Sequence, residues 1–111
     1  DLPIVDESCS ATEMIQRISQ GGLGLIIICR DSEILGIVTD GDVRRAMESK
    51  QAEFFNIHPM DIASTSPKMI APEEKLIEAE KMMTRHKINS LLVVDSNKHL
   101  VGVIQIYDIK L

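Results

Sequence analysis

The sequence predicts a mixed α/β fold made of two copies of one supersecondary unit, packed about a pseudo-twofold axis. The first observation is a repeat: residues 25–43 (LIIICRDSEILGIVTDGDV) align without a gap on residues 91–109 (LLVVDSNKHLVGVIQIYDI), 66 positions later. Three aligned pairs are identical, namely Leu25/Leu91, Gly36/Gly102 and Asp42/Asp108, and eight more exchange one aliphatic residue for another. An internal repeat of this length indicates a duplicated structural unit.

The second observation is that the repeat continues upstream once a one-residue gap is allowed. Ile4-Val5 then aligns with Met69-Ile70, 65 positions later. The gap is placed between a helix and a strand, because loops tolerate insertions. There, residues 19–24 align with the one-residue-longer segment 84–90. Each copy reads strand, helix, strand, strand, helix, with repeat 1 at residues 1–49, a connecting segment at 50–65 and repeat 2 at 66–111.

In the first copy, residues 2–5 form a short strand, and Ser10 precedes a helix with Glu13 at capping-box spacing. The predicted buried stripe of this helix comprises Ala11, Met14, Ile15 and Ile18. Glycines at positions 21, 22 and 24 end the helix. Residues 25–29 form a continuous aliphatic run, which is typical of a strand covered on both faces.

After a turn at residues 31–33, residues 34–39 return as the partner strand. Asp40 is the predicted N-cap of the next helix. The inner face of that helix comprises Val43, Ala46 and Met47.

The second copy repeats this plan with different end signals. A strand is expected at residues 68–71, and Pro72-Glu73-Glu74 is expected to open a helix, with proline early and acids at the positive end of the dipole. The predicted buried stripe comprises Leu76, Ala79 and Met83. Strands follow at 91–94 and 100–104, and a last helical turn starts near Tyr107.

The composition excludes several classes of function. A net charge of −5 and 3% aromatic residues disfavour binding to nucleic acid. The longest apolar run, residues 23–29, is too short to span a membrane. Cys9 and Cys29 lack metal-ligand spacing, so a reduced, cytoplasmic compartment without a metal or cofactor is expected. The sequence shows no candidate acid–base pair, so no catalytic function is predicted for this segment.

A candidate ligand site lies where the first copy's last strand meets its last helix. Thr39 offers a hydroxyl and Asp42 a carboxylate that can accept from a vicinal diol such as a ribose. The helix N-terminus beside them favours an anion. The alternative is that Thr39 and Asp40 only cap the helix.

The pattern Gly-aliphatic-aliphatic-Thr-x-x-Asp, repeated within this plan, resembles a CBS-domain pair, or Bateman module, over essentially the whole chain. The resemblance implies regulatory nucleotide binding in a cleft between the repeats, with Thr39 and Asp42 on the ribose. It also implicates the first strands and the loops before the second strands. These residues are Ile4, Val5, Leu23 and Gly24 in copy one, and Met69, Ile70, Asn89 and Ser90 in copy two.

The second copy departs from the pattern at one position. Gln105 stands where threonine is expected, three residues before Asp108. Glutamine still forms hydrogen bonds, but its longer side chain fills more of a cavity. One occupied site per chain is therefore expected. Phosphate groups of a ligand would meet basic residues, for which Arg45 and the cluster Arg85-His86-Lys87 are the candidates, and a solvated surface charge is the alternative for each.

A narrower resemblance concerns the segment Thr39-Asp40-Gly41-Asp42-Val43-Arg44-Arg45. It is similar to the CBS pairs of bacterial arabinose 5-phosphate isomerases, including the capsule-expression isomerases, which feed 3-deoxy-manno-octulosonate (Kdo) into lipopolysaccharide or capsule. That resemblance implies an N-terminal sugar isomerase domain as partner and CMP-Kdo or an adenine nucleotide as ligand. A similar segment occurs in CBS pairs attached to some sugar nucleotidyltransferases. The alternative function is an assembly element, since CBS pairs often form homodimers.

Overall fold

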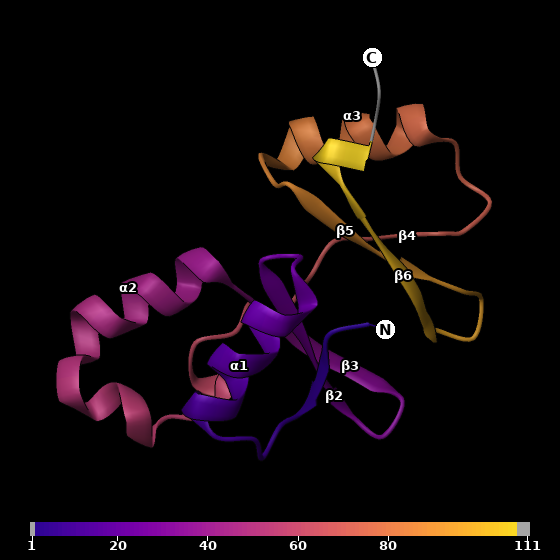
Figure 1. Ribbon diagram of the computed structural model, residues 1–111. Helices are drawn as coiled ribbons and strands as arrows, with labels where there is room; N and C mark the ends of the chain where they lie inside the picture. The colour runs from indigo at the N-terminus through magenta and orange to yellow at the C-terminus, as the bar shows by residue number, and fades with distance from the viewer. Residues whose placement is uncertain (1, 109–111) are drawn as a thin grey trace. The chain divides into compact units, whose positions relative to one another are not determined.

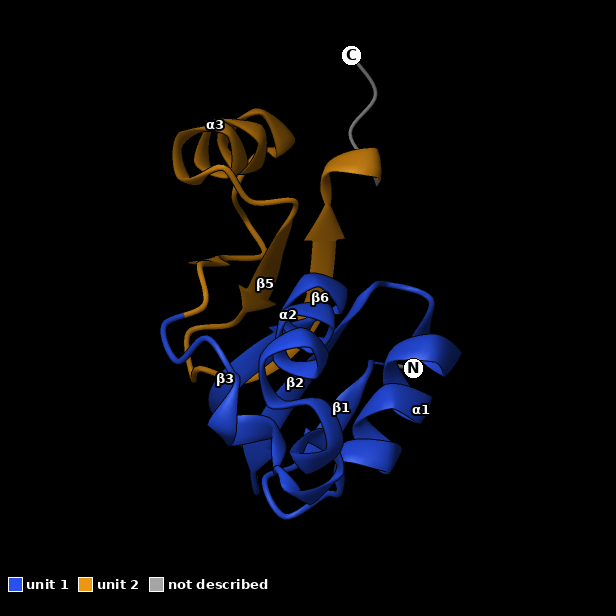
Figure 2. Ribbon diagram, turned by 90° about the vertical axis from the view of Figure 1, so that its left-hand side faces the viewer, with its two compact units in different colours: residues 1–66 blue, residues 67–111 orange. Residues whose placement is uncertain are grey.

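The computed structural model describes residues 2–108, and for Asp108 the backbone alone. The chain divides into two compact units, residues 1–66 and 67–111 (Figure 2). Each unit is a three-stranded sheet with helices, so the prediction of a mixed α/β fold with a duplicated unit is confirmed. The packing of the two copies about a twofold axis stays a prediction.

The first unit contains a three-stranded sheet in the order β1-β2-β3, in which β1 runs parallel and β3 antiparallel to β2. Its elements are β1 (Ile4–Asp6), α1 (Ala11–Gly21), β2 (Leu25–Arg30), β3 (Glu33–Thr39) and α2 (Asp40–Lys50), as labelled in Figure 1. Two short 3-10 helices follow, η1 (Gln51–Asn56) and η2 (Pro59–Asp61). This order matches the strand, helix, strand, strand, helix plan that the sequence predicts.

Helix α1 begins and ends where the sequence predicts. The Ser10 side chain accepts a hydrogen bond from the backbone N–H of Glu13 at 3.1 Å. Gly22 ends the helix in the left-handed conformation with φ of 69°, which glycine adopts without a steric penalty. Ala11, Met14 and Ile18 are buried, and Ile15 packs against them as a partly buried residue.

The core of the first unit lies between the sheet and its helices. Val5, Ile26, Ile28 and Val38 share one face, because Val5 pairs with Ile28 and Ile26 with Val38 across the strands. The helices contribute the stripe of α1 together with Val43, Ala46, Phe54 and Ile57. On β2 the residues of the opposite face are buried as well, since Leu25 and Ile27 are 2% and 0% exposed. The prediction of a strand covered on both faces is therefore confirmed.

Helix α2 begins one residue earlier than predicted. Thr39, not Asp40, is the N-cap: its backbone is extended (φ −104°, ψ 166°), and Asp40 is the first helical residue. The physical reason is the capping box, which needs the carboxylate three residues after the cap, where Asp42 stands. The inner face of α2 is Val43 and Ala46, whereas Met47 is 40% exposed, so its predicted burial is wrong.

The connecting segment returns to the sheet of the first unit. Ser64 pairs with Ile37 on β3 through two backbone hydrogen bonds, of 2.9 and 3.0 Å. His58 Nδ1 lies 3.0 Å from the carbonyl oxygen of Cys9, and because a carbonyl only accepts, this ring nitrogen carries the proton. The segment is thus part of the first unit's structure.

The second unit has the same plan, and its sheet order is β4-β5-β6. Its elements are β4 (Met69–Ile70), α3 (Leu76–His86), β5 (Ser90–Val94), β6 (Leu100–Gln105) and the 3-10 turn η3 (Ile106–Asp108). The helix-facing side of the sheet comprises Ile70, Leu91, Val93 and Ile104, which pack on Ala79 and Met83. The predicted last helical turn near Tyr107 corresponds to η3, and residues 109–111 lie outside the described residues.

Two predictions about the helix of the second copy are wrong. Residues 72–74 form a turn closed by the Glu74 N–H and the Ala71 carbonyl at 3.2 Å, and the helix begins at Leu76 after Lys75 as N-cap. Proline at the second position of a turn is as favourable as proline at a helix start, so the sequence signal fits both. Leu76 then stands at the first helical position and is 54% exposed rather than buried.

The register of the strands also moves the one-residue gap between the repeats. Leu25 pairs with Thr39 in the first unit, and Ser90 pairs with Gln105 in the second. Residues of β2 and β5 therefore correspond at an offset of 65, whereas those of β3 and β6 correspond at 66. The extra residue lies in the second hairpin turn, where three residues (96–98) separate the bonded pair Asp95 and His99, against two (31–32) between Arg30 and Glu33. The predicted gap between helix and strand is wrong, because aliphatic runs still match when shifted by one.

Candidate functional site

The centre of the candidate site is a reciprocal pair of hydrogen bonds between Thr39 and Asp42. The Asp42 N–H donates to the Thr39 hydroxyl oxygen at 3.2 Å, and the Thr39 N–H donates to Asp42 Oδ2 at 3.0 Å. The two bonds satisfy two backbone donors at the start of α2. They also hold the hydroxyl and the carboxylate side by side, with both residues partly buried. The capping interpretation is thus correct for Thr39, and it fixes the geometry of the proposed ligand contacts.

Arg45 occupies the other oxygen of the same carboxylate. Its Nη2 donates to Asp42 Oδ1 at 2.7 Å. The Asp42 side chain is 23% exposed and that of Arg45 is 65% exposed. The sequence predicts Arg45 as a ligand contact, and the structure places it one helical turn after Asp42, in direct contact with it.

The loop before β2 completes the surroundings of this pair. The Gly24 carbonyl accepts from the Asp40 N–H at 2.9 Å, and Gly24 has a positive φ of 72°. A Cβ on Gly24 would lie 3.2 Å from Asp40 Oδ2, so glycine permits the close approach. The structure therefore places Gly24 beside the start of α2, where Thr39 and Asp42 lie, and Leu23 precedes Gly24 in the same loop. The Asp40 side chain beside Gly24 is a neighbour that the motif did not identify.

The first strand of the copy lies further away. In the sheet order β1-β2-β3, strand β2 separates Ile4 and Val5 from Thr39. Val5 is 7% exposed and belongs to the helix-facing core, whereas Ile4 is 38% exposed. Within the first unit, the structure does not bring these two residues next to the Thr39–Asp42 pair.

The corresponding position of the second unit has different chemistry. Gln105 Nε2 donates to the Ser90 hydroxyl oxygen at 3.1 Å, and the two residues are also partners in the β5–β6 ladder. The Asn89 carbonyl accepts from the Ile106 N–H at 2.9 Å, as Gly24 does from Asp40. Asn89, rather than Ser90, is thus the counterpart of Gly24. The carboxylate of Asp108 lies outside the described side chains.

The basic cluster of the second unit stands at the C-terminal end of α3. Arg85 and His86 lie in the last turn, and Lys87 ends the helix in the left-handed conformation with φ of 56°. All three residues are exposed. Positive side chains at this end interact favourably with the helix dipole. The cluster therefore has a structural role besides its predicted contact with an anion.

Other reactive side chains are unsuited to chemistry. Burial raises the pKa of the Cys9 thiol and of the Cys29 thiol, which makes both poor nucleophiles. Among the side chains that the structure describes, no group of three from His, Cys, Asp or Glu is placed to hold a metal ion. Within residues 2–108, no helix is long and apolar enough to cross a membrane.

The chain thus consists of a duplicated sheet-and-helix unit, with a polar Thr–Asp pair at the start of α2 in the first copy. Comparison with known families identifies this unit. A model of the CBS domain matches residues 1–49 and again residues 60–110. The chain therefore belongs to the CBS-domain family and carries a pair of these domains.

Comparison with curated proteins shows which members of the family this chain is similar to. The chain is 34% identical over 104 residues to a probable arabinose 5-phosphate isomerase of Haemophilus influenzae, a match that covers 94% of this chain and 31% of the relative. It is 34% identical over 111 residues to the arabinose 5-phosphate isomerase KdsD of Francisella tularensis, covering 98% and 33%. The chain thus spans about a third of the length of the curated relatives it matches.

Solved structures confirm the fold. A CBS domain protein from Pyrobaculum aerophilum complexed with AMP is 27% identical, with a TM-score of 0.85 over 95% of this chain and 80% of that one. A protein with CBS domains from Burkholderia ambifaria is 24% identical, with a TM-score of 0.87 over 97% of this chain and 79% of that one. The second similarity concerns the fold alone.

Proposed function

We propose that this CBS pair binds a nucleotide and thereby regulates an arabinose 5-phosphate isomerase of which it forms part. The observation that carries the proposal is the Thr39–Asp42 capping box, which fixes a hydroxyl and a carboxylate at the start of α2. The Pyrobaculum neighbour, which is complexed with AMP, supports the class of ligand. The relatives that are isomerases support the class of parent enzyme.

The chemistry at Asp42 fits a ribose. A carboxylate oxygen has two lone pairs, so each oxygen of Asp42 can accept a further hydrogen bond besides its present one. Two neighbouring hydroxyl groups of a ribose supply such donors. The Thr39 oxygen accepts from the Asp42 N–H, and its own hydroxyl proton is left to donate to the ligand. Gly24 supports access of a ligand to Asp42, because the loop before β2 carries no side chain at that position.

The second unit is proposed as an altered site. Gln105 replaces the short threonine hydroxyl by an amide that bonds Ser90, and this arrangement fills part of the corresponding region. One nucleotide per chain is therefore expected. Proposed ligand contacts also include Arg85, His86, Lys87 and the residues of β1 and β4.

The parent enzyme suggests a ligand. If the isomerase feeds Kdo synthesis for lipopolysaccharide or capsule in the cytoplasm, an end-product such as CMP-Kdo would suit feedback inhibition, and an adenine nucleotide is the alternative. Binding would shift the population of conformations that the catalytic domain experiences. A sugar nucleotidyltransferase as parent would imply the same site with a different enzyme.

A thermal-shift panel of AMP, ATP, CMP, CTP and CMP-Kdo tests the proposal. A true ligand raises the free energy of unfolding by about 2.7 kcal/mol at a hundredfold excess over its Kd. Asp42→Asn is the matched variant, because the amide oxygen still accepts from the Thr39 N–H while the negative charge is lost. The expected result is a shift in the wild type that is much smaller in Asp42→Asn.

The contrary result has a defined meaning. No shift with any of the five nucleotides would contradict nucleotide binding and favour the function as an assembly element. Phe55 and Tyr107, which are 62% and 79% exposed, would then be the first side chains to examine for homodimer contacts. An equal shift in wild type and Asp42→Asn would contradict the assignment of Asp42 to the ribose.

A further inference from the structure

We infer that the Arg45 side chain occupies the Asp42 site of its own chain. A nucleotide displaces this side chain, which then pairs with the phosphate of that nucleotide. This makes Arg45 the residue that selects nucleotides over nucleosides. The inference rests on the proposed function and concerns the regulation and specificity of the same site.

The first argument is that both carboxylate oxygens of Asp42 already accept a hydrogen bond. Asp42 Oδ2 accepts from the Thr39 N–H at 3.0 Å, and Oδ1 accepts from Arg45 Nη2 at 2.7 Å. The first bond belongs to the cap of α2 and stays in place with any ligand. The second bond comes from a side chain, and it leaves a ribose hydroxyl only the remaining lone pair of Oδ1, beside the guanidinium. A diol therefore binds best when the guanidinium moves away.

The second argument is the position of the guanidinium. A Cβ on Gly41 would lie 3.2 Å from Arg45 Nη1, 3.5 Å from Nη2 and 3.7 Å from Cζ. The arginine side chain is thus folded back over the first turn of α2. Gly41 leaves the space that this folding needs. The charged group lies at the start of α2, the positive end of the helix dipole, where an anion would be favoured.

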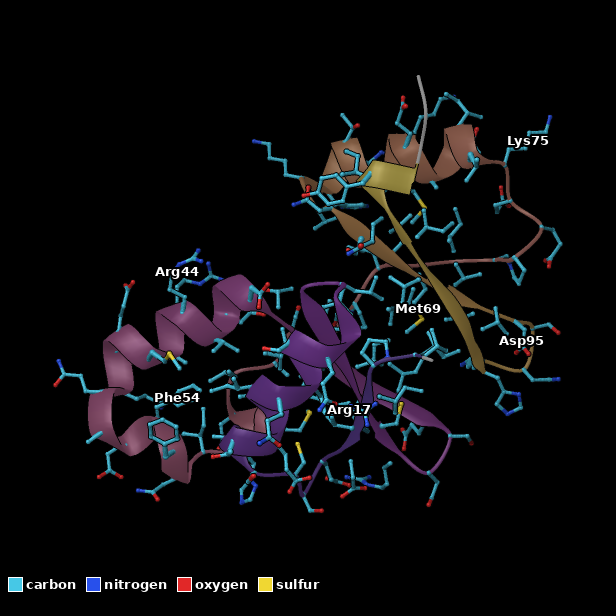
Figure 3. The ribbon with its side chains drawn as sticks, in the orientation of Figure 1. Arg17, Arg44, Phe54, Met69, Lys75 and Asp95 are labelled. Atoms are coloured by element: carbon cyan, nitrogen blue, oxygen red, sulfur yellow. The ribbon has the colours of Figure 1, made fainter. Side chains whose placement is uncertain are left out.

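The third argument is the local charge. Asp40 and Asp42 both lie in the first turn of α2, so an anionic ligand at this helix start meets two carboxylates. Arg45 is the basic side chain in contact with Asp42. Arg44, one residue earlier, is exposed and points outward from α2 (Figure 3). Removal of Arg45 would leave the first turn repulsive to phosphate while exposing Oδ1 to hydroxyl donors.

The energetics favour displacement. Exposed ion pairs contribute little to stability because solvent screens them, and the Arg45 side chain is 65% exposed. An arginine paired with a phosphate forms a stronger, two-pronged interaction. A nucleotide therefore compensates for the broken pair with its own phosphate. A nucleoside breaks the same pair and offers the guanidinium no phosphate in return.

Isothermal titration of the full chain with AMP, adenosine, CMP and cytidine tests this inference. Arg45→Met keeps the aliphatic stem and removes the charge, and Arg44→Met is the matched control on the same helix. In Arg45→Met, the nucleotide affinity is expected to fall about tenfold or more, while the nucleoside affinity rises about twofold to fivefold. Arg44→Met should change neither affinity by more than about twofold.

Three outcomes would overturn the inference. Equal losses for nucleotide and nucleoside in Arg45→Met would make Arg45 a structural residue, and unchanged affinities would make it a spectator. Either result leaves the proposed function intact, since the wild type still binds. Absence of binding of all four compounds to the wild type would instead overturn the proposed function, and this inference with it. Thermal unfolding of both variants checks that each is folded.

Discussion

The backbone of Gly36 passes so close to Ser64 that a Cβ on Gly36 would lie 2.6 Å from the Ser64 carbonyl oxygen. The cause is the pairing of Ser64 with Ile37, which places the connecting segment along the edge of β3. Gly102 is the matching glycine of the repeat. Among the residues that the structure describes, its added Cβ would meet only the Val93 side chain, at 3.9 Å. Identical glycines in the two copies thus have different packing.

Gly36→Ala and Gly102→Ala should therefore differ sharply in stability. Alanine at position 36 forces the connecting segment away from β3, and overpacking of this kind costs about 1–3 kcal/mol. Alanine at position 102 fits in ordinary contact, so we expect a change of about 0.5 kcal/mol or less. Urea unfolding of both variants measures the difference. Equal destabilisation of the two variants would contradict the assigned role of Ser64.

Lys87→Gly should stabilise the second unit. Lys87 ends α3 with a positive φ of 56°, where the corresponding residue of the first copy, Gly22, has φ of 69°. A residue with a Cβ pays a steric cost in this conformation, so glycine should gain about 0.5–1 kcal/mol. Gly22→Ala, in open space but with the same backbone, should lose a similar amount. Thermal unfolding checks both, and a loss in Lys87→Gly would show that the lysine charge at the helix end outweighs the strain.

Lys75→Ser should also stabilise α3, since Lys75 is an N-cap that provides no side-chain hydrogen bond. A serine hydroxyl can accept from a free N–H of the first turn, as Ser10 does for Glu13 in α1. The expected gain is about 0.5–2 kcal/mol, and Ser10→Ala should lose a similar amount. Helical circular dichroism during urea unfolding provides the measurement. No gain at position 75 would mean that the turn at residues 72–74 cannot present the new hydroxyl.

The sequence predicted the elements and the Thr39–Asp42 pair because both depend on local patterns. Aliphatic runs, glycines after α1 and the threonine–aspartate spacing act within a few residues. The position of the one-residue gap between the repeats was not predictable. By residue type Leu25 aligns well with Leu91, whereas the backbone register matches Leu25 with Ser90. Hydrogen-bond register depends on both strands of a ladder at once. Local patterns do not contain that information.

The contacts at the site that were not predicted from the sequence also depend on residues distant along the chain. The approach of Asp40 to Gly24 joins the start of α2 to the loop before β2, which only the β2–β3 hairpin brings together. The pairing of Arg45 with Asp42 is an exception, because residues three apart share a helix face and the sequence therefore contains a signal for it. The exposure of Met47 depends on what α2 packs against, which no pattern within the helix reveals.

The ion pair between Glu7 and Arg30 should make stability depend on pH. Arg30 Nη2 donates to Glu7 Oε1 at 3.0 Å, and this hydrogen-bonded guanidinium lowers the pKa of Glu7 below its ordinary value of 4.5. The unfolded chain, with its higher pKa, takes up the proton first as the pH falls. The stabilisation is therefore complete above pH 4.5 and is lost as the pH falls through the lower pKa of the folded state.

A double-mutant cycle with Glu7→Gln, Arg30→Gln and the double variant isolates this pair from the other carboxylates. The coupling energy should be favourable at neutral pH, should fall towards zero in acid, and should weaken with added salt because the Arg30 side chain is exposed and that of Glu7 is partly exposed. Thermal unfolding at a series of pH values gives the coupling. A coupling energy that stays constant from neutral to acidic pH would show that the pair acts through packing rather than charge, because the aliphatic stem of Arg30 would then be the stabilising part.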